Sequence, residues 1–275
     1  MGESMESRHV DTGLGRLRLR LAGSGPALMF WPSLLMDGGM WQAQAAHFSD
    51  RYRVILVDSP GHGASQALTR LFSFEECARA IVEILDALGI DRAHFVGNSW
   101  GGMIGGTFAA TYPARVGVAI LMNCTASACG WRQKLEYFLL TRILWRAGRV
   151  PGFMVGQAVD AFIGPTSARE RPQVGEAIRA AVGRANARSV YWAIRSVVPA
   201  RPDQHGLMAR IRTPVLVVAG EEDRTFPVAE TAAMARSIPG AEFTVMKRTA
   251  HLAGLECPAE VNTLIDDFLA RHHLG

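Results

Sequence analysis

The sequence reads AHFVGNSWGGMIGG from residue 93 to residue 106, and one serine, Ser99, stands in it between two glycines. Residues 97–101 fit the pattern G-x-S-x-G, in which a serine occupies a sharp turn between a buried strand and a helix. Gly97 and Gly101 have no Cβ atoms, so the strand and the helix that follows it can approach each other closely at this turn. We expect Ser99 to stand at the carboxyl end of the strand, near the N-terminus of the helix.

Short apolar runs along the chain predict the strands of a sheet. The run at 16–23 alternates between apolar and polar residues, as a half-exposed strand does. Continuous apolar runs are typical of parallel strands covered on both faces, and they occupy 27–31, 53–58, 93–98, 116–123 and 214–220. A shorter run at 241–246 predicts a strand at the edge of the sheet.

Helical patterns alternate with these strands, at 74–90, 103–113, 228–239 and 258–273. The alternation predicts an α/β fold with a mostly parallel, twisted sheet flanked by helices. Helical stretches rich in bulky apolar residues fill 131–148, 153–164 and 168–198, where no strong strand pattern occurs. We therefore expect a helical cap inserted after the sixth core strand. The expected parts of one catalytic unit are a core at 1–123 and 211–275 and a cap or lid at 124–210.

The composition narrows the class of protein. The chain has 275 residues, 49% of them apolar, and a formal net charge of +4 with scattered basic residues, so we expect no nucleic acid partner. No apolar run is long enough to span a membrane, and the N-terminus has no apolar signal region. The four cysteines form no CxxC pair, which predicts reduced thiols in a cytoplasmic protein and no metal site.

A serine hydroxyl needs a base to act as a nucleophile at neutral pH. Asp223 follows the apolar run at 214–220, and His251 follows the run at 241–246. Ligands of open α/β sheets bind at the carboxyl ends of the strands, so we expect both residues to lie near Ser99. His251 would take the proton of Ser99 and return it to the leaving group, and Asp223 would orient His251 and stabilise its charge.

Other residues compete for these two roles. Glu221 and Glu222 precede Asp223 in the same loop, and the spacing from the flanking Gly220 and Pro227 favours Asp223. The histidines that compete with His251 lie in a Gly-rich turn, in a buried strand and in a polar linker, which favours structural or surface roles for them: His62, His94 and His205.

Four segments together resemble the alpha/beta-hydrolase superfamily over nearly the whole chain: VDSPGHGAS (57–65), GNSWGG (97–102), GEEDRTFP (220–227) and KRTAHLAGLECP (247–258). A fifth segment, WPSLLMDGGMW (31–41), is similar to 3-oxoadipate enol-lactonase-like members. The serine in the elbow argues against the haloalkane dehalogenase and epoxide hydrolase branches, which use an aspartate nucleophile.

The resemblance also implies an oxyanion hole, made by the backbone N–H groups of Leu34 and Trp100. Here Pro32 and Ser33 stand where many relatives have His-Gly after the third strand. Ser33 takes the place of Leu34 as donor if the register slips by one residue.

We therefore expect a serine hydrolase that cleaves an ester or lactone through an acyl-enzyme, with no metal or organic cofactor. The alternatives are a C–C bond hydrolase, a thioesterase, a haloperoxidase-like member of the same fold, or a ligand receptor with little turnover. The expected partner is a small-molecule substrate, with no nucleic acid or membrane, and the sequence leaves monomer and dimer open.

The cap is expected to choose the substrate. Most of the bulky aromatic residues of the cap are expected to be packing residues. Candidates for lining an apolar pocket are Ser33, Trp131, Phe138, Trp145 and Trp192. Cap cations that are candidates for meeting a substrate carboxylate are Arg132, Lys134, Arg142 and Arg146.

Overall fold

The computed structural model describes residues 5–272. Within this range the strands form one eight-stranded sheet with the order β1-β2-β4-β3-β5-β6-β7-β8. Their bounds are β1 (Glu6–Thr12), β2 (Gly15–Ala22), β3 (Ala27–Trp31), β4 (Arg53–Val57), β5 (Ala93–Asn98), β6 (Val116–Met122), β7 (Val215–Gly220) and β8 (Glu242–Met246). β1, β2 and β4 pair antiparallel, and all pairs from β4 to β8 are parallel.

The continuous apolar runs are explained by the two layers of helices. Successive residues of a strand point to opposite faces of the sheet. In β3, Met29 and Trp31 belong to the apolar cluster on one face, whereas Leu28 and Phe30 belong to the cluster on the other. Both clusters are closed by helices, so every position of the strand is buried and apolar.

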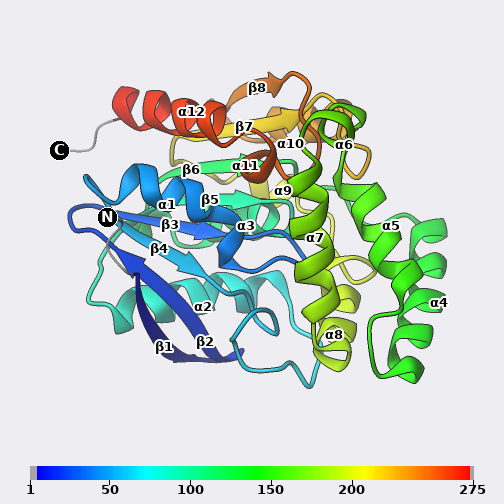
Figure 1. Cartoon of the computed structure of the whole chain (residues 1–275). Coiled ribbons are helices and arrows are strands. Elements are labelled where there is room, and N and C mark those ends of the chain that lie inside the picture. Colours follow the sequence, from blue (N-terminus) through cyan, green and yellow to red (C-terminus); the bar gives the residue numbers. More distant parts are fainter. Residues whose placement is uncertain (1–4, 273–275) are drawn as a thin grey trace.

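Helices cover both faces of this sheet (Figure 1). One face packs against α2 (Phe74–Ala87), α3 (Trp100–Thr111) and α10 (Val228–Ser237). The other face packs against α1 (Gln42–Phe48), α11 (Ala253–Glu256) and α12 (Pro258–Arg271). Two 3-10 turns, η1 (Gly38–Trp41) and η2 (Pro113–Arg115), connect elements of the core.

The cap lies between β6 and β7 in the chain and stands beside the carboxyl ends of the parallel strands (Figure 1). Its helices are α4 (Trp131–Ala147), α5 (Gly152–Phe162), α6 (Pro165–Glu170), α7 (Pro172–Arg184), α8 (Ala187–Val197) and α9 (His205–Met208). The predicted α/β fold and the helical cap after the sixth strand are thus confirmed.

The structure differs from the sequence reading at several elements. β1 is an additional strand, missed because its exposed edge position next to β2 lets it carry polar residues with little apolar pattern. The helical stretch predicted at 168–198 is interrupted, because the Asn186 side chain accepts hydrogen bonds from the amides of Arg188 and Ser189 and begins α8 there. α1, α6, α9 and α11 have seven residues or fewer, too few for a helical period to be recognised.

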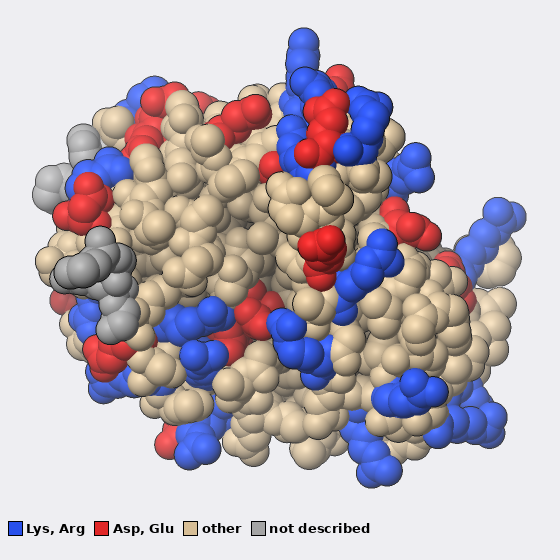
Figure 2. All heavy atoms as spheres, in the orientation of Figure 1, with Lys and Arg blue, Asp and Glu red and all other residues tan. Residues whose placement is uncertain are grey.

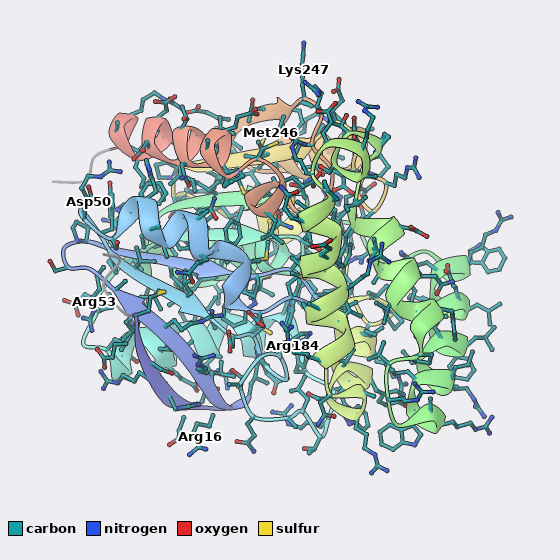
Figure 3. The ribbon with its side chains drawn as sticks, in the orientation of Figure 1. Arg16, Asp50, Arg53, Arg184, Met246 and Lys247 are labelled. Atoms are coloured by element: carbon teal, nitrogen blue, oxygen red, sulfur yellow. The ribbon has the colours of Figure 1, made fainter. Side chains whose placement is uncertain are left out.

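β8 is the edge strand that the sequence predicts. Its last residue, Met246, is buried, whereas Lys247 projects from the molecule (Figure 3). The four cysteines are free and buried. Within residues 5–272, no helix combines the length and the apolar character needed to cross a membrane.

Candidate active site

Ser99 occupies a strained turn between β5 and α3. Its backbone has φ 55° and ψ −113°, a region that residues other than glycine rarely adopt. A Cβ atom on Gly97 would lie 2.3 Å from the carbonyl carbon of Gly101, and one on Gly101 would lie 2.3 Å from the carbonyl oxygen of Trp31. The two glycines therefore allow α3 to begin directly against β3 and β5, as the sequence pattern predicts.

Asp223 and His251 form a buried pair next to this turn. Nδ1 of His251 lies 2.8 Å from Oδ2 of Asp223, and both side chains are fully buried. Because a carboxylate can only accept, Nδ1 carries the proton and Nε2 has the free lone pair. Nε2 has no hydrogen-bond partner within the described chain. His251 and Ser99 line the same cavity, so this lone pair is available to a group that enters it.

The carboxylate of Asp223 is held by three further donors. Its Oδ1 accepts from the amides of Thr225 and Phe226, at 2.8 and 3.1 Å. Its Oδ2 also accepts from Nδ2 of Asn123, at 3.1 Å. These hydrogen bonds fix the carboxylate beside Nδ1 of His251, where it is placed to stabilise a positive charge on the ring.

Asn123 is a positioning residue that the sequence reasoning missed. It follows β6 with φ 49°, and its Nδ2 also donates to the carbonyl oxygen of Ala250 at 2.8 Å. It thus joins the loop of Asp223 to the loop of His251. The available signal was an Asn directly after a buried strand, because Asn tolerates a positive φ better than most residues.

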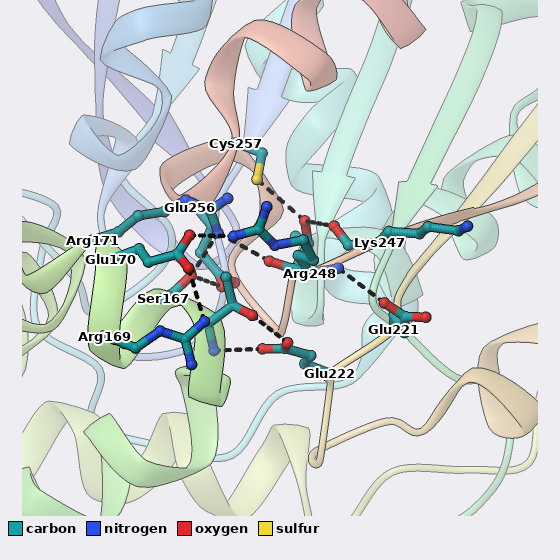
Figure 4. Close-up of polar contacts among 12 residues, drawn as sticks. Ser167, Arg169, Glu170, Arg171, Glu221, Glu222, Lys247, Arg248, Glu256 and Cys257 are labelled. Carbon is teal, nitrogen blue, oxygen red and sulfur yellow. Dashed lines mark hydrogen bonds and ion pairs between the residues drawn. The ribbon is translucent and has the colours of Figure 1, made fainter.

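The competing carboxylates of the same loop point elsewhere (Figure 4). Glu221 accepts from the amide of Arg248 at 3.0 Å. Glu222 accepts from the amide and the hydroxyl of Thr166, at 2.9 and 2.6 Å. Of the three carboxylates, Asp223 is the one that the fold brings to His251.

The competing histidines are also occupied elsewhere. Nδ1 of His94 accepts from the amide of Val118, and Nε2 of His205 lies 3.2 Å from the hydroxyl of Ser127. His62 donates from Nδ1 to the carbonyl of Pro60 and accepts at Nε2 from the amide of Leu35.

The imidazole of His62 therefore anchors the turn that follows β3. Its Nε2 lies 3.1 Å from the amide nitrogen of Leu35, so this nitrogen must stay unprotonated for the hydrogen bond to form. Burial lowers the pKa of His62 below its usual value. Both effects keep the ring neutral.

Glu256 is a second positioning residue that the sequence reasoning missed. Its carboxylate accepts from the amides of Ala250 and Leu252, which flank His251, at 3.1 Å each. It also accepts from the hydroxyl of Ser167 in the cap at 2.5 Å (Figure 4). Burial raises the pKa of Glu256 above its usual range. This side chain fixes the loop of His251 and connects it to the cap.

The two backbone amides expected to form the oxyanion hole make no backbone hydrogen bond within the described chain. Trp100 is the first residue of α3, where an amide has no acceptor within the helix. Leu34 lines the cavity, and its amide makes no hydrogen bond within the described chain. The amide of Ser33 instead points to Sδ of Met40 at 3.4 Å, and Ser33 is not part of the cavity wall. The geometry therefore favours Leu34 over Ser33.

The cavity that holds Ser99 and His251 has a volume of about 320 Å³ and lies between the core and the cap. Most of its wall is apolar, and the cap contributes Tyr137, Leu140, Leu144, Met154, Phe162 and Ile194. The pocket residues expected from the sequence are not among those that line it: Ser33, Trp131, Phe138, Trp145 and Trp192. Trp131 and Trp145 are 72% and 43% exposed, because the cap helix turns that side to solvent.

Arg201 is a buried cation at the cavity wall. Its Nε donates to the carbonyl oxygen of Ser127 at 2.8 Å, and its guanidinium lies over the ring of Phe226. Burial lowers the pKa of Arg201. Among the ion pairs of residues 5–272, none involves Arg201. The four cap cations singled out from the sequence do not line the cavity: Arg132, Lys134, Arg142 and Arg146.

The described residues contain no cluster of three or more His, Cys, Asp or Glu side chains that could hold a metal ion. At the core side of the cavity, the hydroxyl of Ser99 and the lone pair of His251 lie close to the backbone amides of Leu34 and Trp100. Such a set can activate a hydroxyl and stabilise an oxyanion on a carbonyl substrate.

Comparisons with known proteins fit this arrangement. The sequence model of a family described as the alpha/beta hydrolase fold matches residues 26–258. The chain is similar to a 2-hydroxy-6-oxononadienedioate/2-hydroxy-6-oxononatrienedioate hydrolase from Paraburkholderia phymatum, with 30% identity over 98% of this chain and 93% of that protein. It is also similar to 3-oxoadipate enol-lactonase 2 from Acinetobacter baylyi, with 27% identity over 90% of this chain and 89% of that protein.

Among solved structures, the chain is similar to a thermophilic esterase from Thermogutta terrifontis, described as malate bound. The TM-score is 0.90 at 28% identity, and the match covers 98% of this chain and 100% of that chain. The similarity therefore includes the cap as well as the core.

Proposed function

The chain belongs to the alpha/beta hydrolase fold family, and on that premise we propose that it is a serine hydrolase that cleaves a carboxylic ester or lactone of a largely apolar small molecule. The observation that carries the proposal is the buried pair of Asp223 and His251. Its hydrogen bond leaves the lone pair on Nε2 of His251, in the wall of the cavity that also contains Ser99.

In the first half of the reaction, Oγ of Ser99 attacks the carbonyl carbon while Nε2 of His251 takes the hydroxyl proton. The amides of Leu34 and Trp100 stabilise the resulting oxyanion, a contribution of about 3 kcal/mol for each such donor. Asp223 stabilises the imidazolium of His251. The C–O bond then breaks, and the imidazolium returns the proton to the leaving alcohol.

In the second half, His251 takes a proton from water, and the hydroxide attacks the carbonyl carbon of the acyl-enzyme. The same two amides stabilise the second oxyanion. The bond from Ser99 to the acyl group breaks, His251 gives its proton back to Ser99, and the carboxylic acid leaves. A lactone follows the same steps, except that the leaving alcohol stays attached to the acid.

The cavity supports an apolar substrate of modest size. Leu, Met, Val, Ile and Phe side chains make up most of its wall, from both the core and the cap. A volume of about 320 Å³ suits a small molecule.

Labelling with a fluorophosphonate and mass spectrometry tests the proposal directly. We expect an adduct on Ser99, none on the Ser99→Ala variant, and loss of turnover of a short p-nitrophenyl ester by about 10⁴-fold or more in that variant. Ester turnover retained by Ser99→Ala would overturn the proposal. An adduct on Ser99 without turnover of any ester or lactone in a panel of graded acyl length would favour a ligand receptor.

A second candidate is hydrolysis of a C–C bond in a substrate that bears a carboxylate. Arg201 is the observation that favours it. Its buried guanidinium lies at the cavity wall and makes no direct ion pair within the described chain, although Glu230 acts on its charge at longer range, so it is suited to binding a carboxylate. Relatives named for the hydrolysis of a dienedioate support the same class of substrate. The same three side chains and two amides would then act on a ketone carbonyl.

Kinetics with 2-hydroxy-6-oxononadienedioate and a neutral p-nitrophenyl ester separate the two candidates. In Arg201→Gln we expect KM for the dioate to rise about tenfold or more, with much less change for the neutral ester. Arg210→Gln, an exposed arginine outside the cavity, is the matched control. Turnover of the ester together with no turnover of the dioate would exclude the second candidate.

A further inference from the structure

Helix α4 turns two different faces to its surroundings. Its inner face contributes Gln133, Tyr137, Leu140 and Leu144 to the cavity wall. Its opposite side, which we call the α4 outer face, carries six exposed apolar side chains: Trp131, Leu135, Phe138, Leu139, Ile143 and Trp145. Leu135 and Leu139 are 55% and 54% exposed. The helix is thus apolar on both sides. On the outer side, Trp145 contacts Tyr191 and Trp192 of α8 but is still 43% exposed, and the other five side chains are 45% to 72% exposed.

This concentration of exposed apolar side chains is confined to one part of the molecule. Of the ten exposed large apolar side chains in residues 5–272, seven lie between residues 131 and 153. The α-helical repeat of 3.6 residues aligns Trp131, Leu135, Phe138 and Trp145 along one line of α4. A contiguous exposed apolar surface of this kind marks a site of interaction.

The charges around the α4 outer face are mostly positive. Residues 131–149 contain five cations and a single carboxylate, Glu136. None of the five takes part in an ion pair with a residue of the described chain: Arg132, Lys134, Arg142, Arg146 and Arg149. In Figure 2 the surface over α4 and α8, at the lower right, is tan with blue groups around it and little red.

The cations are interleaved with the aromatic rings. The guanidinium of Arg132 lies over Trp131, that of Arg142 over Phe138, and that of Arg188 in α8 over Trp145, at 5.3 to 5.5 Å from the ring centres. These contacts keep the positive charges at the level of the apolar side chains. A partner that covers the rings must therefore also accept the charges.

We propose that the α4 outer face binds an anionic lipid surface, with α4 lying in the plane of the lipid headgroups. Helices that bind membrane surfaces combine Trp, Phe and Leu side chains, which enter the boundary with the acyl chains, with Lys and Arg, which meet anionic headgroups. The expectation that the chain has no membrane partner rests on the lack of a spanning segment, which does not bear on a helix that lies on the surface.

A second copy of the chain fits this face poorly. Two α4 outer faces placed against each other would bring ten cations together with two carboxylates, and like charges across an interface oppose association. Anionic headgroups instead complement this excess of positive charge. The apolar side chains also form an exposed ridge on a single helix, which suits insertion into a lipid boundary.

Flotation with vesicles tests the proposal on the whole chain, and its readout does not depend on catalysis. We expect the protein to float with vesicles of phosphatidylcholine and phosphatidylglycerol, to float much less with phosphatidylcholine alone, and to be released by salt. Leu135→Ser/Leu139→Ser and Arg142→Gln/Arg146→Gln should each weaken binding by about tenfold or more. Brominated lipids should quench fluorescence in the wild type more than in Trp131→Phe.

Matched variants elsewhere on the surface serve as controls. Leu71→Ser/Phe243→Ser removes two other exposed apolar side chains, and Arg210→Gln/Arg236→Gln removes two other exposed cations. Both should bind vesicles as the wild type does, and near-UV circular dichroism confirms that all variants are folded. The proposal is overturned if the wild type does not bind anionic vesicles, or if the control and α4 variants bind equally. It is also overturned if light scattering shows a dimer that only the α4 variants abolish.

Discussion

The loops at the carboxyl edge of the sheet and helix α4 of the cap face each other across one cavity, but they are built in opposite ways. In the loops, Asp223 and His251 are buried, and hydrogen bonds specify their positions. In α4, only Thr141 and Leu144 are buried. The difference supports the proposal that the core side supplies the chemistry and the cap side admits the substrate.

Among variants that test the difference between the two regions, we expect Asp223→Asn to have the largest effect, on kcat. An amide at this position favours the wrong tautomer of His251, so kcat for a p-nitrophenyl ester should fall by about 10⁴-fold, with a smaller change in KM. Steady-state kinetics measures the loss. Glu222→Gln, in the same loop, is the control, because Glu222 bonds to Thr166 rather than to His251. An equal loss in both variants would show that the loop as a whole, not the Asp223–His251 pair, had been disturbed.

The two sides of α4 provide the next test. Leu144→Ala removes a buried side chain, so the free energy of unfolding should fall by about 2–4 kcal/mol. Leu135→Ala removes an exposed side chain, so the change should stay within about 0.5 kcal/mol. Urea denaturation of both variants measures the difference. Similar losses in the two variants would contradict the assignment of an inner and an outer face.

Glu256→Gln tests the connection between the two regions. Glutamine cannot accept from both flanking amides and from Ser167 as the carboxylate does, so the free energy of unfolding should fall by about 1–3 kcal/mol. Because these amides flank His251, kcat should fall as well. Thermal unfolding and ester kinetics measure the two effects. Glu260→Gln, an exposed residue at the start of α12, should change neither.

The smallest effect concerns pH and His62. Burial lowers the pKa of His62 in the folded state, whereas the unfolded chain has a histidine pKa of about 6.5. The contribution of neutral His62 to the free energy of unfolding is therefore fully present above the pKa of the unfolded chain. It is lost as the pH falls below that value toward the lower pKa of the folded state. The slope contributed by this group is at most about 1.4 kcal/mol per pH unit. Urea denaturation at a series of pH values should show a shallower dependence in His62→Gln, and identical slopes would contradict the assignment.

Much of the core could be predicted from the sequence because its signals are local. The apolar runs of β3 to β7 reflect burial on both faces of the sheet. The glycines of the elbow are required by contacts within a few residues of Ser99 and by the backbone of β3. β1 and the short helices were missed because an exposed edge strand and a single helical turn leave little pattern in the residues.

The cap could be predicted only in outline. The sequence predicts its helices, but it does not tell which of their bulky apolar residues pack, which line the pocket and which face solvent. The period of a helix shows which residues share a face, but not which face meets the core. For α4, the residues that point inward are Tyr137, Leu140 and Leu144, and the tryptophans point to solvent.

The sequence by itself determined the class of fold, the elbow at Ser99 and the order of the serine, acid and histidine loops. Each of these can be recognised from short segments of neighbouring residues. Only the tertiary structure decided that Asp223 rather than Glu221 or Glu222 meets His251, that Asn123 and Glu256 hold the two loops, and that α4 has an exposed apolar face. These facts join residues far apart in the chain. Their distances follow from how the sheet, helices and cap pack, which no local pattern of residues specifies.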